Sequence, residues 1–209
     1  MLETEIYQSK EIHPSILYYG TPVILLCTLN EDGTTNISPL SSSWALEDRI
    51  VIGCSVDGKA YENLCHHRAC VINVPDPALW ENVEKLASLT GKKAMPEWKR
   101  AAGFHYKKDK FTTAGLTAEP SKIVKPARIK ECPLQIEAAV QHIRVSSGES
   151  FAIIETQAVC IHAHHRIAIG NKYIDPAKWS PLIYNFRHYF SLGAELGKTF
   201  RAESKPDTP

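Results

Sequence analysis

The twelve residues 35–46, TNISPLSSSWAL, carry five small hydroxyl side chains together with an Asn, a Pro and a Trp. Small hydroxyls and backbone N–H groups can line a phosphate without a net positive charge. Pro39 favours an extended bend that exposes N–H groups, and Trp44 offers a flat apolar face to an aromatic ring. The stretch therefore predicts an anion cradle. The alternative is a polar loop, since Ser and Asn favour turns and Pro39 interrupts strands.

Two nearby segments carry side chains of the same chemistry. Ser55 ends an apolar run, and the following SVDGKAYEN brings Lys59 and Asn63 to the start of a predicted helix. A helix N-terminus with a nearby Lys is a ready site for a phosphate. The alternative is that Lys59 is solvated and that Asn63 bonds only to local backbone.

The segment CIHAHH offers a different chemistry. Cys160, His162 and His164 share one face of a strand if the period of two holds, and all three are zinc ligand types. Alternate residues of a strand lie ~6.5 Å apart, so three ligands from one strand do not converge easily. The segment 65–70, CHHRAC, lacks paired Cys-x-x-Cys spacing. We therefore expect no metal, and keep a metal-binding protein using the His-rich strand as a weaker alternative.

The elements that must position these residues follow from apolar patterns and turn signals. Asp-Gly pairs at residues 32–33 and 57–58 predict turns. Asp76 and Pro77 are suited to begin a helix. The predicted strands are 22–30, 49–56, 69–75, 133–145 (with a slip before Ile143) and 151–165, and the predicted helices are 59–68, 77–90 and a short one near 97–102.

Strands at both ends of the chain with helices between them predict a mainly β fold with helical insertions. We expect one domain over 1–203, with a helical and loop insertion at about 76–130, and a flexible tail over 204–209. The part of the insertion over 92–130 is rich in Lys and contains Trp98, Phe104 and Tyr106. These aromatic side chains predict that it packs on the body of the domain.

Composition excludes some classes of protein. The 209 residues have a formal net charge of +1, which argues against a dedicated nucleic-acid binder. No run approaches the ~20 apolar residues of a membrane span. The N-terminal residues are acidic and polar, without the apolar region of a secretory signal, so a cytoplasmic location with six reduced cysteines is expected.

Taken in order, NISPLSSSWAL, VIGCS, KAYENL and CVINVP resemble the flavin reductase-like family of FMN-binding split-barrel proteins, which includes flavoredoxin-like proteins. AVCIHAHH and YIDPAKWSPLIYNFRHYFSLG are similar to the closing segments of that family, and LWENVEKLASLTG to KFTTAGLT resembles an insertion in one of its branches. The resemblance covers roughly residues 14–201.

The resemblance implies an FMN-binding split β-barrel that holds FMN non-covalently, usually in a homodimer with the flavin near the interface. Ser55, Lys59 and Asn63 would serve the ribityl-phosphate end, and Tyr189 would lie near the cofactor or the partner subunit. Trp44 belongs to the same cofactor site. The residues expected around the isoalloxazine and the ribityl chain are Asn36, Ser38, Ser41, Ser42 and Ser43.

Two positions depart from the family pattern. Ala60 stands where relatives have Thr, three residues before Asn63, and Tyr184 stands where many have Arg. Lys59 or Tyr61 could replace the missing hydroxyl, and Arg187 could replace the missing Arg.

The function expected from the sequence is an FMN-binding oxidoreductase of the flavin reductase-like class. Reducing equivalents would pass from NAD(P)H through FMN to a small-molecule or flavin acceptor, and the catalytic residues are unassigned. The alternative from another class is a non-catalytic FMN-binding electron-carrier module.

Overall fold

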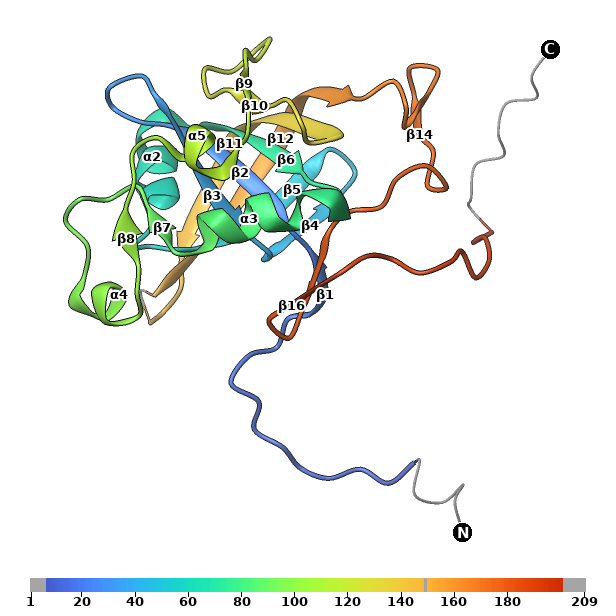
Figure 1. Ribbon diagram of the computed structural model, residues 1–209, viewed down its shortest axis with the longest axis horizontal. Helices are drawn as coiled ribbons and strands as arrows, with labels where there is room; N and C mark the ends of the chain where they lie inside the picture. The colour runs from blue at the N-terminus through green and yellow to red at the C-terminus, as the bar shows by residue number, and fades with distance from the viewer. Residues whose placement is uncertain (1–6, 149, 201–209) are drawn as a thin grey trace.

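The computed structural model describes residues 7–148 and 150–200, so the tail predicted over 204–209 lies outside the described residues. At its centre is a seven-stranded antiparallel sheet with the strand order β3-β2-β6-β11-β12-β5-β4 (Figure 1). Its strands are β2 (Ile24–Leu29), β3 (Thr35–Leu40), β4 (Ser43–Leu46), β5 (Arg49–Ser55), β6 (Ala69–Val74), β11 (Leu134–Val145) and β12 (Phe151–Ala163). Five of these, β2, β5, β6, β11 and β12, lie within the ranges predicted from the sequence.

The two edge strands of this sheet are consecutive in the chain. Only Ser41 and Ser42 lie between the end of β3 and the start of β4, although the sheet order puts these strands at opposite edges. Two residues span at most about 7 Å, so the sheet must curl until its edges meet. The backbone N–H of Gly53 on β5 donates to the carbonyl of Ser42 at 2.7 Å and fixes the junction.

Strand β2 is buried along its whole length because apolar side chains cover both of its faces. Ile24 and Leu26 point into the barrel, where they pack with Ile52, Ile72 and Ile154. The alternate residues of β2 point outward into a second apolar cluster that helices cover. The members of that cluster include Val23, Leu25, Cys27, Ile37, Val83, Leu86 and Ala114.

Helices and short strands surround the barrel. The helices are α2 (Lys59–His67), η1 (Pro77–Leu79), α3 (Trp80–Ala87), α4 (Glu97–Ala101) and α5 (Lys110–Ala114). The short strands are β1 (Tyr19–Pro22), β7 (Leu89–Thr90), β8 (His105–Tyr106), β9 (Ala118–Glu119), β10 (Arg128–Ile129), β13 (Ala168–Ile169), β14 (Tyr173–Ile174), β15 (Ile183–Asn185) and β16 (His188–Phe190). None of the described helices is both long and apolar enough to cross a membrane.

Three details differ from the sequence prediction. Residues 35–40 form a strand, because Pro39 lies on an edge strand, where a residue without an N–H is tolerated. The helix predicted over 77–90 ends at Ala87, since Leu89 and Thr90 pair in parallel with β8. Trp98 is 53% exposed, and its ring packs edge to face against Phe104 within the insertion.

Two predicted local features are confirmed. The side chain of Asp76 accepts a hydrogen bond from the N–H of Ala78 at 3.1 Å and so begins the helical segment. The register of β11 against β12 shifts between Val140 and His142, which is the slip predicted before Ile143.

A lysine is buried behind the edge strand β3. Lys110, at the start of α5, is 2% exposed, and its Nζ donates to the carbonyl of Ile37 at 2.7 Å. Burial lowers the pKa of Lys110 to about 8, against an ordinary value of 10.5. The ammonium thus gives the Ile37 carbonyl of the edge strand β3 a hydrogen-bond donor, but it loses its own hydration.

Between pH 8 and 10.5 the unfolded chain holds the proton of Lys110 and the folded chain releases it. We expect this group to add roughly 3 kcal/mol to the free energy of unfolding as the pH rises through that window. Urea unfolding at pH 7.5 and pH 10 measures it as the difference between the wild type and Lys110→Met. Lys85→Met, on the exposed side of α3, is the matched control. A pH-independent difference for Lys110→Met would contradict the prediction.

Candidate functional site

A cavity of about 660 Å³ lies beside the junction of β3 and β4. Ser41 and Ser42 line it from the junction, and Gly53, Cys54 and Ser55 line it from β5. A Cβ on Gly53 would lie 3.1 Å from the Cβ of Ser42, so the glycine allows this close approach. The hydroxyl-rich stretch therefore meets the end of β5 at one hollow.

Aromatic side chains form another wall of this cavity. Tyr18, Phe151, Tyr184 and Tyr189 line it, and the Tyr184 and Tyr189 rings are 5.8 Å apart. The hydroxyl of Tyr18 lies 2.6 Å from Oγ of Ser42. Burial and the bond that the Tyr189 hydroxyl donates to Glu84 at 2.9 Å raise the pKa of Tyr189, so the phenol stays protonated. The cavity thus combines flat apolar surfaces with neutral hydroxyl groups.

A second cavity, of about 430 Å³, is lined by charged groups. Asn36 and Lys59 border it, together with Lys92, Lys93 and Lys108. Glu62 pairs with Lys59 and, at 3.1 Å, with Lys92. Burial alone would raise the pKa of Glu62, but the two lysines outweigh it and lower that pKa. The cavity therefore holds four ammonium groups beside the ionised Glu62, and its lining also includes the carboxylates of Glu31 and Asp32, the latter paired with Lys108.

The two cavities border the same turn, residues 56–58. Ser55 lies in the first cavity and Lys59 in the second. The carbonyl of Ser55 accepts from the N–H of Gly58 at 3.0 Å, and its hydroxyl accepts from the N–H of Asp57 at 3.3 Å. Gly58 precedes α2 and supplies no side-chain cap. The first N–H groups of α2 therefore remain available beside Lys59.

The ten residues predicted for the cofactor site separate into three groups. Ser41, Ser42, Ser55 and Tyr189 line the first cavity, and Asn36 and Lys59 line the second. Ser38 lies on β3 between Asn36 and the first cavity, and its Oγ accepts from Nδ2 of Asn36 at 3.1 Å. Ser38 therefore lies outside both linings, as do Ser43, Trp44 and Asn63.

The three outlying residues have other surroundings. Ser43 is half-buried on β4, and Trp44 is 59% exposed. Asn63 is buried, and its Nδ2 donates to Oγ1 of Thr28 at 3.1 Å and to Oδ1 of Asn30 at 2.9 Å. Its observed hydrogen bonds thus connect α2 to β2 and the turn after it.

The two positions that depart from the family pattern also have defined surroundings. Ala60 is 3% exposed and its side chain packs in the barrel core, so that side chain offers no polar atom to either cavity. Tyr184 lines the first cavity, whereas Arg187 is exposed and absent from its lining. The ring of Tyr184 therefore forms part of the cavity wall, and Arg187 does not take the place of the Arg that many relatives have there.

Several lining residues were not predicted from the sequence. Tyr18 lies in a polar N-terminal segment with no pattern of its own, and Gly53 is one residue in an ordinary apolar strand. Lys92 and Lys93 were visible only as part of a Lys-rich insertion. Their pairing with Glu62 and Tyr106 depends on the tertiary fold.

Known proteins with the same architecture identify the class. Residues 16–193 match the flavin reductase like domain. The chain is 61% identical over 196 residues to the uncharacterized protein YdfE of Bacillus subtilis (strain 168), covering 93% of this chain and 95% of that protein.

Two solved structures have the same fold. The flavoredoxin of Desulfovibrio vulgaris (Miyazaki F) matches with a TM-score of 0.77 and 20% identity, over 93% of this chain and 99% of that one. The flavoredoxin from Methanosarcina acetivorans matches with a TM-score of 0.75 and 16% identity, over 93% and 96% of the two chains.

The chain therefore belongs to the flavin reductase-like family. This confirms the resemblance seen in the sequence and the fold class, a mainly β split barrel with helical insertions. At the level of the family, it is a flavin-binding oxidoreductase.

Asn36 and Lys59 can pack closely against the backbone of Gly91 in the wall of the second cavity because Gly91 has no side chain. A Cβ there would lie 2.5 Å from Oδ1 of the buried Asn36 and 3.0 Å from Cγ of Lys59. We expect Gly91→Ala to reduce the free energy of unfolding by about 1–3 kcal/mol, because Asn36 must move. The control is Gly148→Ala, whose Cβ would meet open space. Equal urea midpoints for the two variants would contradict this reading of the wall.

Proposed function

We propose that the chain holds FMN non-covalently, with the ring in the first cavity and the phosphate in the second. The observation that carries the proposal is the pair of cavities on either side of residues 56–58, one aromatic and hydroxyl-lined, the other lined by four lysines and three carboxylates. A flat ring joined to a phosphate by a polyol chain matches this division. Holding FMN in this way, the chain would pass reducing equivalents from NAD(P)H to a small-molecule or flavin acceptor.

The first cavity has the chemistry that an isoalloxazine ring needs. Ser41 and Ser42 offer hydroxyl groups to the polar edge of the ring, and Tyr184 and Tyr189 offer faces for stacking. Its size, about 660 Å³, lies within the usual range of cofactor sites. Ser43 and Trp44 follow Ser42 along the chain, and we propose them only as neighbours of the ring.

The second cavity has the chemistry that a phosphate needs. Lys59 begins α2, whose first N–H groups have no side-chain cap, so positive charge and helix dipole favour an anion there. Asn36 and Ser38 would face the polyol chain between the cavities, and Asn63 would hold the helix in position through its bonds to Thr28 and Asn30. Because Lys59 and Lys92 already share Glu62, the phosphate would compete with that carboxylate.

Bound FMN would supply the hydride and electron transfer. The chain's own residues then need only bind and orient it, exclude water and stabilise negative charge. Ser41 and Ser42 hydroxyls suit the last role, since neutral donors fixed in a cavity stabilise a developing anion without a proton transfer. We assign no catalytic acid or base.

We further propose a homodimer in the cytoplasm with the flavin near the subunit interface. The outer face of the barrel exposes apolar side chains on β4 and on β12, which β5 separates, with exposed fractions of 59% for Trp44, 67% for Leu46 and 62% for Ile161. A face of this kind favours association with a second copy. The six described cysteines are free, in keeping with a reducing compartment.

Replacing Lys59 tests the phosphate position. Lys59→Ala should weaken FMN binding roughly 10- to 100-fold, because a charged contact to the phosphate is worth about 1.5–3 kcal/mol. Titration followed by the flavin absorbance and fluorescence measures the dissociation constant. Lys85→Ala, on the exposed side of α3, should bind as the wild type does. If Lys59→Ala bound FMN as tightly as the wild type, the phosphate would lie elsewhere.

A non-catalytic electron carrier is the second candidate, and one observation favours it. Of the described residues that line the first cavity, none carries a formal charge, so a nicotinamide dinucleotide finds no cation there. Oxidation of NADH and NADPH in the presence of FMN distinguishes the two functions. We expect catalytic oxidation of at least one of them in proportion to protein concentration. A protein that binds FMN and leaves both nucleotides unoxidised would be a carrier.

A further inference from the structure

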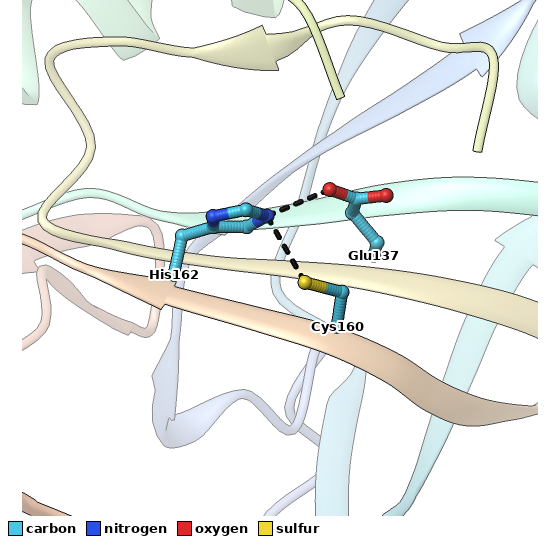
Figure 2. A group of neighbouring side chains, drawn as sticks. All are labelled: Glu137, Cys160 and His162. Atoms are coloured by element: carbon cyan, nitrogen blue, oxygen red, sulfur yellow. Dashed lines mark hydrogen bonds and ion pairs between the residues drawn. The ribbon is translucent and has the colours of Figure 1, made fainter. Parts of the chain in front are cut away.

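Three side chains of different chemistry meet on the face of β11 and β12 that lies under the β9–β10 hairpin. Nε2 of His162 lies 2.7 Å from Oε1 of Glu137 and 3.4 Å from Sγ of Cys160 (Figure 2). One ligand-type atom from each residue lies within 4.8 Å of the other two. Neither of the cavities assigned to the flavin includes any of the three residues.

The strand register brings these residues together. Cys160 and His162 are alternate residues of β12 and therefore share a face, and Glu137 on β11 is paired directly with Cys160. No metal was expected from the sequence because three ligands from one strand would not converge easily. The neighbouring strand supplies the third group instead, and His164 is not part of the cluster, because its Nε2 lies 2.9 Å from the carbonyl of Lys130.

The carboxylate of Glu137 is held firmly in place. Its side chain is fully buried, and it accepts hydrogen bonds from the backbone N–H groups of Lys122, Ile123 and Val124 at 2.6–2.9 Å. The carboxylate therefore has a fixed position, while Cys160 and His162 remain partly exposed.

The geometry excludes a nucleophile–base relay. In such a relay the carboxylate orients one imidazole nitrogen and the thiol meets the other. Here Glu137 and Cys160 both approach Nε2, and Nδ1 points away from them (Figure 2). The arrangement instead suits a single ion bound by the sulfur, the nitrogen and the oxygen together.

We propose that Glu137, Cys160 and His162 form a binding site for one zinc ion. A thiolate, an imidazole and a carboxylate are the three side-chain ligand types of zinc in proteins. Zinc bonds of about 2.0–2.3 Å in tetrahedral geometry separate neighbouring ligand atoms by about 3.4–3.6 Å. The present 3.4 Å between Sγ and Nε2 meets this, and the pair Nε2 and Oε1 must open from 2.7 Å. Rotation of the partly exposed His162 can supply that movement.

Binding is an exchange of protons for the metal. The ion replaces the proton between Nε2 and Oε1, which moves to Nδ1 of the neutral ring, and the thiol of Cys160 loses its proton to solvent as the sulfur–zinc bond forms. Glu137 keeps its three backbone hydrogen bonds and offers a remaining lone pair of Oε1. With three protein ligands, the fourth position belongs to water.

Cobalt(II) is the probe, because it takes zinc's geometry and reports sulfur ligation in its spectrum. Protein as purified is treated with a chelator, dialysed and titrated with Co²⁺, and difference spectra are recorded against the same sample without metal. We expect one equivalent of Co²⁺ to produce a thiolate charge-transfer band in the near ultraviolet and visible bands of tetrahedral intensity, and one equivalent of Zn²⁺ to abolish both.

Matched variants assign the bands. Cys160→Ser should lose the charge-transfer band and weaken Co²⁺ binding roughly tenfold or more, and His162→Gln should also weaken it. Cys65→Ser and His164→Gln change an exposed thiol and a histidine outside the cluster and should bind as the wild type does. Circular dichroism checks that each variant is folded.

The proposal is overturned if the wild type shows no saturable charge-transfer band, or if the band persists in folded Cys160→Ser. A band that disappears in Cys65→Ser instead would also overturn it, since the metal would then be bound on α2. None of these outcomes depends on whether the chain binds FMN, because the readout is sulfur ligation of cobalt.

Discussion

The rest of the structure depends on one covalent constraint: two residues join the opposite edges of a seven-stranded sheet. Because Ser41 and Ser42 are all that separates β3 from β4, the sheet closes, and the bond from Gly53 to Ser42 fixes where it closes. The junction leaves little space for side chains, so the residues there are small. The hydroxyl-rich stretch is therefore required by the fold and available to a ligand for the same physical reason.

The second cavity arises where the insertion returns to the barrel. Gly91, Lys92 and Lys93 follow the short strand β7, whose pairing with β8 holds this segment against α2. The barrel supplies Asn36 and Lys59, and the insertion supplies the remaining ammonium groups. Ala60 lacks the hydroxyl that relatives have at this position. This is compatible with an anion site, because the Ala60 side chain packs in the core and other elements provide the polar atoms.

Features that depend on local pattern could be predicted from the sequence. The five long strands, α2, the Asp76 cap and the slip near Ile143 each follow from a few neighbouring residues. Features that depend on pairing could not. Leu89 and Thr90 lie at the end of a predicted helix and become a strand because β8 lies beside them. Pro39 is tolerated in a strand because none of the described strands pairs with the outer edge of β3.

The same limit explains the metal-type cluster and defines what it could do. Glu137 carries no local signal, and only the register of β11 on β12 brings it to Cys160. Along β12, Cys160 lies nine positions, or roughly 30 Å of strand, from Phe151, which lines the first cavity. At that separation an ion would not contact a ring beside Phe151. Its effect would fall on residues 122–124, which Glu137 already holds, and so on the β9–β10 hairpin.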